Sequence, residues 1–127
     1  MRGLVFALLA TTALPIQNCI QTIRNQVPGQ KACTDLYAYG VSADVTNAST
    51  GVPVTHATLP LRDGAYTEVM QNFPTGDYVG AGERAGTYTL TAEANGFVSQ
   101  TIDNIVVTAG ECHVNGVRVD IQLVPAQ

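Results

Sequence analysis

Residues 87–97 read TYTLTAEANGF, and this stretch decides the fold class. Tyr88, Leu90 and Ala92 alternate with threonines, which is the period-two pattern of a strand that has one buried face and one face in water. Asn95-Gly96 follows, and this dipeptide is the strongest short-range signal for a two-residue hairpin turn. The stretch therefore predicts a strand, a tight turn and the start of a returning strand.

The same alternation recurs on both sides of this hairpin. We predict seven short strands, at residues 37–45, 54–62, 66–70, 87–94, 97–102, 105–108 and 117–123. Arg62-Asp63-Gly64 predicts a second tight hairpin, and Asn115-Gly116 predicts a bulge before the last strand. No segment after residue 18 has helical spacing. Seven strands at such intervals predict an all-β sandwich.

This strand pattern is interrupted in one segment, residues 71–86, and at one residue, Pro60. Residues 71–86 contain Pro74 and four glycines without a regular period, so we predict a long loop with one short strand near Tyr78-Val79. Pro60 lies inside the predicted strand 54–62, and because proline donates no ladder hydrogen bond, we expect it at a sheet edge or a bulge.

Length and charge exclude several classes of protein. The 127 residues suffice for one domain but not for two with separate cores. Only 13% of the residues are charged, and the net charge is −4. A chain of this kind has no basic stripe with which to bind nucleic acid through phosphates, or an anionic lipid surface by charge.

The N-terminus reads as an export signal. Arg2 is followed by the apolar run 3–14 and by Pro15, a pattern that is typical of a signal peptide and too short to span a bilayer of about 30 Å. Cleavage after Ala13 and lipid attachment to Cys19 both remain open, although Asn18 departs from the small residue that a lipoprotein signal requires. We expect a signal peptide at 1–18, a tether at 19–32 and a β-sandwich domain at 33–124.

The chain has three cysteines, Cys19, Cys33 and Cys112. In an oxidising compartment an even set is expected to pair, and Cys33 and Cys112 flank the strand-rich region. We predict a disulfide between these two cysteines. The competing interpretations are three free thiols or a metal site, but no C-x-x-C occurs and neither histidine has ligand spacing to two cysteines.

The order of turns and strands resembles a known family. Residues 50–54 read TGVPV and precede Ala57; residues 86–92 read GTYTLTA and precede the turn before Phe97. This order is similar to that of the carboxypeptidase regulatory-like domains. The resemblance covers about residues 36–124 and implies a seven-stranded, transthyretin-like (prealbumin-like) Greek-key sandwich. Cys112-His113-Val114 is also similar to a strand start in bacterial envelope lipoproteins that carry this domain.

The resemblance implies an accessory or interaction module more than it implies an enzyme. Neither His56, on the solvent side of its predicted strand, nor His113, beside Cys112, belongs to a nucleophile motif. We therefore predict no catalytic residues, no metal site and no cofactor. Calcium stays open as an alternative at the acidic residues near predicted turns, which are Asp63, Asp77, Glu83 and Asp103.

We predict a non-catalytic, exported β-sandwich domain in the periplasm or at the cell surface. It would be attached to the membrane only through a lipid on Cys19, and would present the 71–86 loop to a protein or glycan partner in the cell envelope. The alternative is a small carbohydrate-binding domain, because exposed aromatic rings stack on sugars. Its predicted binding residues are Tyr66, Phe73 and Tyr78, whereas Tyr37, Tyr39 and Tyr88 are expected in the core.

Overall fold

The Asn95-Gly96 turn lies where the sequence predicts it. It lies within the connection between β6 (Gly86–Ala92) and β7 (Gln100–Ala109), which pair antiparallel. The returning strand begins at Gln100 and not at the predicted Phe97, whose backbone bridges Pro125 instead. Gly96 has a φ of +86°, a left-handed conformation that glycine adopts without the steric cost of a Cβ. The computed structural model describes residues 33–127.

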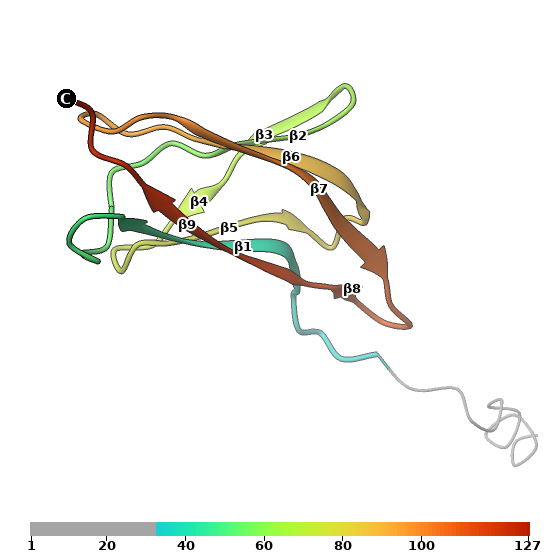
Figure 1. Cartoon of the computed structure of the whole chain (residues 1–127). Coiled ribbons are helices and arrows are strands. Elements are labelled where there is room, and N and C mark those ends of the chain that lie inside the picture. The colour runs from blue at the N-terminus through green and yellow to red at the C-terminus, as the bar shows by residue number, and fades with distance from the viewer. Residues whose placement is uncertain (1–32) are drawn as a thin grey trace, which may run out of the picture. The chain divides into compact units, whose positions relative to one another are not determined.

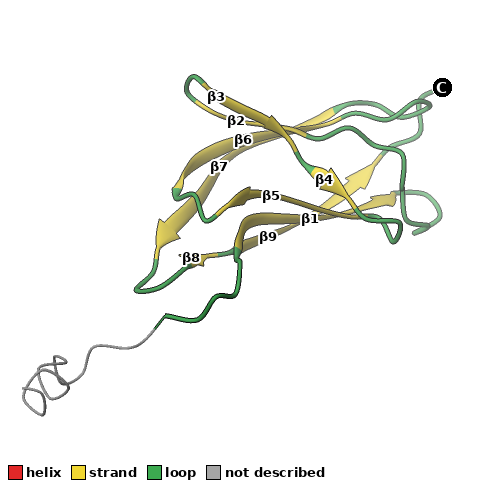
Figure 2. Cartoon of the chain, turned by 180° about the vertical axis from the view of Figure 1, so that it is seen from behind, coloured by secondary structure: helices red, strands yellow, loops and turns green. Residues whose placement is uncertain are grey.

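Residues 33–127 form two β-sheets that pack face to face as a sandwich (Figures 1 and 2). One sheet has the order β4-β5-β1-β9, and the other has the order β3-β2-β6-β7-β8. The strands β1 and β9 run parallel, while the other neighbouring strands run antiparallel. The remaining strand bounds are β1 Tyr39–Asn47, β2 Pro60–Asp63, β3 Tyr66–Val69, β4 Gln71–Asn72, β5 Asp77–Gly82, β8 Val114–Asn115 and β9 Val117–Leu123.

The all-β sandwich is confirmed, with nine strands in the described residues where seven were predicted. Two of the nine, β4 and β8, are only two residues long. The predicted bulge at Asn115-Gly116 is wrong: at Gly116 the chain passes from β8 in the five-stranded sheet to β9 in the four-stranded sheet. The two-residue turn after Asp63 is present, and it joins β2 to β3.

The core lies between the sheets and comes from the inward positions of their strands. On β6 the buried positions are Tyr88, Leu90 and Ala92, as their alternation predicts. The largest fully buried side chains come from both sheets and from the segment before β2: Tyr78, Tyr88, Leu59, Leu61, Leu90, Ile121, Leu123, Val41 and Val45. Burial of apolar surface on this scale is the main force that holds the sheets together.

The predicted long loop at 71–86 is wrong in its extent, because most of the segment is strand; the short strand predicted near Tyr78-Val79 is present within β5. β5 is an interior strand of the four-stranded sheet and pairs with both β1 and β4. Its glycines serve close packing rather than turns. A Cβ on Gly80 would lie 3.0 Å from Cγ of Met70 and 3.3 Å from Cδ2 of Leu61, so a larger residue would crowd the core. The segment is therefore not free as a whole to meet a partner.

The predicted strand 54–62 is mostly irregular backbone. Regular pairing begins at Pro60, the first residue of β2, where the missing donor is tolerated although β2 is an interior strand. Before it, Thr58 forms only an isolated bridge to Glu93. The burial of Ala57, Leu59 and Leu61 on one side agrees with the sequence pattern.

Of the three tyrosines predicted in the core, only Tyr88 is fully buried. Tyr39 is half-buried, and Tyr37 is 64% exposed, so its predicted place in the core is wrong. Tyr37 precedes β1, and its ring meets that of Tyr39 edge to face, with centroids 5.2 Å apart. The chain at Tyr37 has not yet entered the sheet, which is why alternation did not place it.

The predicted signal peptide, the tether and Cys19 lie outside the described residues. Within residues 33–127 we find no helix with the length and apolar character needed to cross a membrane.

Candidate functional site

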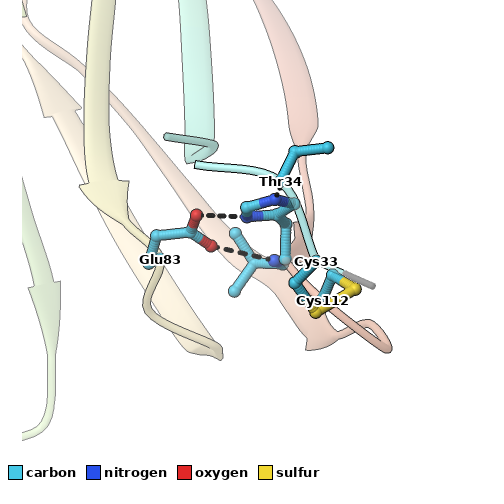
Figure 3. The surroundings of a disulfide bond; sticks show 6 residues. Cys33, Thr34, Glu83 and Cys112 are labelled. Atoms are coloured by element: carbon cyan, nitrogen blue, oxygen red, sulfur yellow. Dashed lines mark hydrogen bonds and ion pairs between the residues drawn. A yellow bond between two sulfur atoms is a disulfide. The ribbon is translucent and has the colours of Figure 1, made fainter. Parts of the chain in front are cut away.

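The predicted cysteine pair is present as a disulfide between Cys33 and Cys112 (Figure 3). It joins the segment that leads into β1 to the turn between β7 and β8, across 79 positions of sequence. Disulfides persist in oxidising compartments, so this bond indicates an extracytoplasmic protein. It also brings together the residues that follow each cysteine, Thr34 and His113.

His113 lies between two polar side chains beside the disulfide (Figure 3). Its Nδ1 lies 2.5 Å from Oε2 of Glu83, and its Nε2 lies 3.3 Å from Oγ1 of Thr34. The carboxylate of Glu83 also accepts the backbone N–H groups of Ala38 and Val114. The hydrogen bond from His113 lowers the pKa of Glu83. The cluster fastens three separate segments at one end of the sandwich.

The acidic residues considered for calcium do not gather at one place. Among the described residues no group of three or more histidine, cysteine or acidic side chains has the arrangement of a metal site. Asp63 pairs with Arg84 at 2.9 Å, and Glu83 pairs with His113. Asp77 lies 3.5 Å from Arg118, which also pairs with Asp44.

Tyr66, Phe73 and Tyr78 do not form the predicted aromatic platform. Tyr78 has no exposed surface, and its hydroxyl donates to the carbonyl of Val54 and accepts the N–H of Ala57. Its role as a sugar-stacking residue is therefore wrong: the ring packs in the core because its position on β5 points inward. Burial raises the pKa of its phenol.

The other two rings of that predicted platform differ from each other. The guanidinium carbon of Arg84 lies 3.8 Å from the centroid of the Tyr66 ring, so that one face of this ring is covered by a cation. The Tyr66 hydroxyl donates to Glu68. Phe73, in the turn between β4 and β5, remains 38% exposed. An isolated ring of this kind offers a single contact rather than a platform.

A polar groove beside the Asn95-Gly96 turn is a candidate binding site. It has a volume of about 380 Å³ and is lined by His56, Thr58, Glu93, Ala94, Asn95 and Ser99. One wall comes from the segment before β2, and the other comes from the connection between β6 and β7. Its volume lies near the lower end of the range of small-molecule sites, about 300–1,000 Å³.

Backbone hydrogen bonds hold the two walls together. Thr58 and Glu93 exchange N–H···O bonds of 2.7 and 3.0 Å. The turn itself is tied to the C-terminal segment, because Val98 donates to the carbonyl of Val124 and Ala126 donates to that of Gly96. A groove with fixed walls loses little conformational entropy when a ligand binds.

An aromatic pair lies at the same place. The rings of His56 and Phe97 have centroids 6.3 Å apart and are tilted by 46°. Phe97 is half-buried and packs against the core, so its ring is held in position. The groove therefore combines hydroxyl, amide, carboxylate and imidazole groups, and the Phe97 ring lies behind its His56.

The His56 imidazole makes one long contact within the groove. The only hydrogen bond that the described residues offer the His56 ring is a long one, 3.5 Å, to the carbonyl of Asn95. No hydroxyl among the described residues lies within hydrogen-bond distance of this imidazole, whereas an activated serine or threonine needs such a base. Polar groups spaced in this way are able to hydrogen-bond a ligand.

Sequence reasoning placed His56 on the surface, correctly, but did not connect it with Glu93, Asn95 or Ser99. The outward alternation of 87–93 shows that Glu93 faces solvent. The missing information was the bridge between Thr58 and Glu93, which joins residues 35 positions apart. Alternation gives the face of each residue but not the partner across the sheet.

No protein-family model matches this chain, and no curated protein matches it. A solved structure of a candidate carbohydrate-binding protein from Bacteroides uniformis ATCC 8492 has a similar β-sandwich, with a TM-score of 0.47 and 17% sequence identity. The similarity covers 67% of this chain and 40% of that protein. This chain thus spans well under half of that protein's length.

Proposed function

We propose that this chain is a non-catalytic, exported interaction module that binds its partner through the groove beside the Asn95-Gly96 turn. The observation that carries the proposal is the groove itself, whose walls are joined by the paired hydrogen bonds of Thr58 and Glu93. Polar groups on a rigid framework are typical of a recognition site. The His56 imidazole, which lies 3.5 Å from the carbonyl of Asn95 and beside the Phe97 ring, supports binding.

Export and anchoring are the second part of the proposal. The Cys33–Cys112 disulfide supports an oxidising compartment, and the apolar run 3–14 supports a cleaved signal. Lipid on Cys19 would attach the module to the envelope membrane. The motifs at 50–57 and 86–97 support a carboxypeptidase regulatory-like module with Greek-key, transthyretin-like topology.

Carbohydrate binding is the second candidate function. Its support is the pairing of His56 and Phe97 beside the polar groove, because a sugar ring presents C–H groups on its face and hydroxyls at its edge. The solved structure of the candidate carbohydrate-binding protein has a similar β-sandwich, but this second proposal rests on the groove residues of the present chain alone. The residues involved differ from the three aromatic residues of the sequence prediction.

Site-specific photocross-linking in the source organism tests the module. A photoreactive residue replaces Asn95 in the groove, and a matched one replaces Asp120 on β9 of the other sheet. We expect a defined envelope component, protein or glycan, on the Asn95 adduct alone. Equal labelling from both positions, or none from Asn95, would refute the proposal. Turnover by the purified chain in a hydrolase panel would refute its non-catalytic part.

A further inference from the structure

A second hollow adjoins the groove on the outer face of the five-stranded sheet. It has a volume of about 210 Å³ and is lined by Pro60, Leu61, Arg62, Thr67, Thr89, Thr91 and Glu93. Glu93 is the one residue that lines both hollows, so its side chain stands at the boundary between them. Together they form a track that runs from Arg62 and Thr67, across β2 and β6, to the turn at Asn95. We call this surface the Glu93 track.

The Glu93 track is rich in hydroxyl groups. On β6, Thr89 and Thr91 point outward because the alternate residues Tyr88, Leu90 and Ala92 fill the core. Thr67 on β3 lies opposite Arg62 of β2 on the same outer face. Thr91 lies opposite Thr101 on β7, and their Oγ1 atoms are 3.4 Å apart. Thr58 and Ser99 continue the hydroxyl series into the groove. Each hydroxyl is both a donor and an acceptor.

The carboxylate and guanidinium charges that line the Glu93 track cancel each other. Its lining has one carboxylate, Glu93, and one guanidinium, Arg62, at separate positions. Anionic polymers are held by clusters of arginine and lysine, and the whole chain has a net charge of −4. Both observations favour an uncharged ligand.

We infer that the Glu93 track binds a linear, neutral oligosaccharide; this inference rests on the proposed binding function of the groove. One sugar ring lies against the His56–Phe97 pair, Glu93 accepts hydrogen bonds from sugar hydroxyls at the junction, and further rings lie along the threonines. A ligand made of repeated hydroxyl-bearing rings matches an elongated surface of hydroxyls better than a single compact ligand does.

The test measures binding of the full exported chain, with its disulfide formed, by calorimetry. The probes are cellotetraose, maltotetraose and N-acetylchitotetraose, the dimer of each, and tetragalacturonate as an anionic tetramer. We expect at least one neutral tetramer to bind, more tightly than its dimer, and tetragalacturonate not to bind. A track with several contact points requires this dependence on length.

Three variants locate the site. His56→Ala and Glu93→Gln should each weaken tetramer binding about tenfold, the change expected for the loss of one good contact. Asp120→Asn makes the same change of charge on the other sheet and should have no effect. Thr91→Val should weaken the tetramer but not the dimer, whereas Thr87→Val, outside both hollows on the same strand, should change neither.

The outcomes separate this inference from the proposed function. If no neutral tetramer binds while Asn95 still cross-links a protein, the inference is wrong and the interaction module stands. If tetramer and dimer bind equally and Thr91→Val has no effect, the ligand occupies the groove alone and the track is refuted. If tetragalacturonate binds as tightly as the neutral tetramers, the charge argument is refuted. If neither tetramer binding nor cross-linking occurs, both proposals fail.

Discussion

Nδ1 of His113 lies 2.5 Å from Oε2 of Glu83, and this contact closes the end of the sandwich next to the disulfide (Figure 3). Glu83 follows β5 and has a φ of +50°, a conformation that L-residues rarely adopt. The carboxylate of Glu83 accepts hydrogen bonds from the backbone N–H groups of Ala38 and Val114. The hydrogen bonds of one side chain thus join the entries to β1 and β8 with the end of β5.

Acid should weaken this closure. The pKa of Glu83 in the folded chain lies below its ordinary value of 4.5, chiefly because His113 hydrogen-bonds the carboxylate. A lowered folded pKa means that the ionised carboxylate stabilises the fold above the unfolded pKa. This stability is lost as the pH falls through the folded pKa. We therefore expect the free energy of unfolding to fall as the pH drops below the ordinary value of 4.5 and through the lowered pKa of Glu83.

Urea unfolding of the parent and of Glu83→Gln at a series of pH values tests this expected loss of stability in acid. The variant should be less stable than the parent near neutral pH, and its stability should depend less on pH in the acid range. Glu111→Gln alters an exposed carboxylate with no hydrogen-bond partner in the described residues, and should keep the parent's slope. Equal slopes for Glu83→Gln and the parent would show that Glu83 does not carry the effect.

Removal of the disulfide should cost more than any single hydrogen bond. Cys33 and Cys112 enclose a loop of 79 positions, for which the chain-entropy model gives about 4–5 kcal/mol. The double variant Cys33→Ser/Cys112→Ser should lose up to about that much in chemical unfolding. The reduced parent is the control, and should be destabilised to a similar extent. An oxidised parent no more stable than its reduced form would contradict the prediction.

The buried hydroxyl of Tyr78 should matter for stability rather than for ligand binding. Tyr78→Phe leaves the N–H of Ala57 and the carbonyl of Val54 without their partner, which should cost about 1–3 kcal/mol. Tyr37→Phe is the matched control, because that ring is 64% exposed, and it should change the free energy of unfolding little. Equal effects of the two substitutions in urea unfolding would contradict this assignment.

The parts of the fold that could be predicted are those coded by local alternation and turn chemistry. Tyr88, Leu90 and Ala92 are buried because a strand repeats every two residues, and Gly64 and Gly96 lie in the turns that their dipeptides predict. The disulfide followed from the compartment and the cysteine count. None of these predictions requires knowledge of which strands pair with each other.

What could not be predicted depends on contacts between distant segments. The glycines of β5 resemble loop residues, yet Gly80 is small because Met70 and Leu61 pack over it. Tyr78 looked like an exposed ring in that supposed loop, and the error in the loop became an error in the binding site. The groove arises only when Thr58 and Glu93 pair, and no local pattern specifies this pairing.

We expect Gly96 to affect the free energy of unfolding only through its left-handed backbone conformation. Its φ is +86°, and a Cβ added there would meet no atom within 4 Å, so Gly96→Ala tests conformational strain without a steric clash. We expect a loss of about 1 kcal/mol in urea unfolding, and a smaller loss for Gly96→Asn, because asparagine tolerates left-handed backbone better. Gly64 is the matched control.

Gly64 has a φ of +58° and equally open surroundings, in the β2–β3 turn at the other end of the same sheet (Figure 1). Gly64→Ala should therefore cost a similar amount. We expect only Gly96→Ala to change the shape of the groove, because Gly96 adjoins Asn95 and its carbonyl accepts the N–H of Ala126. Gly96→Ala should reduce cross-linking from Asn95, while Gly64→Ala should leave it unchanged. Equal cross-linking from both would show that the groove does not depend on the shape of this turn.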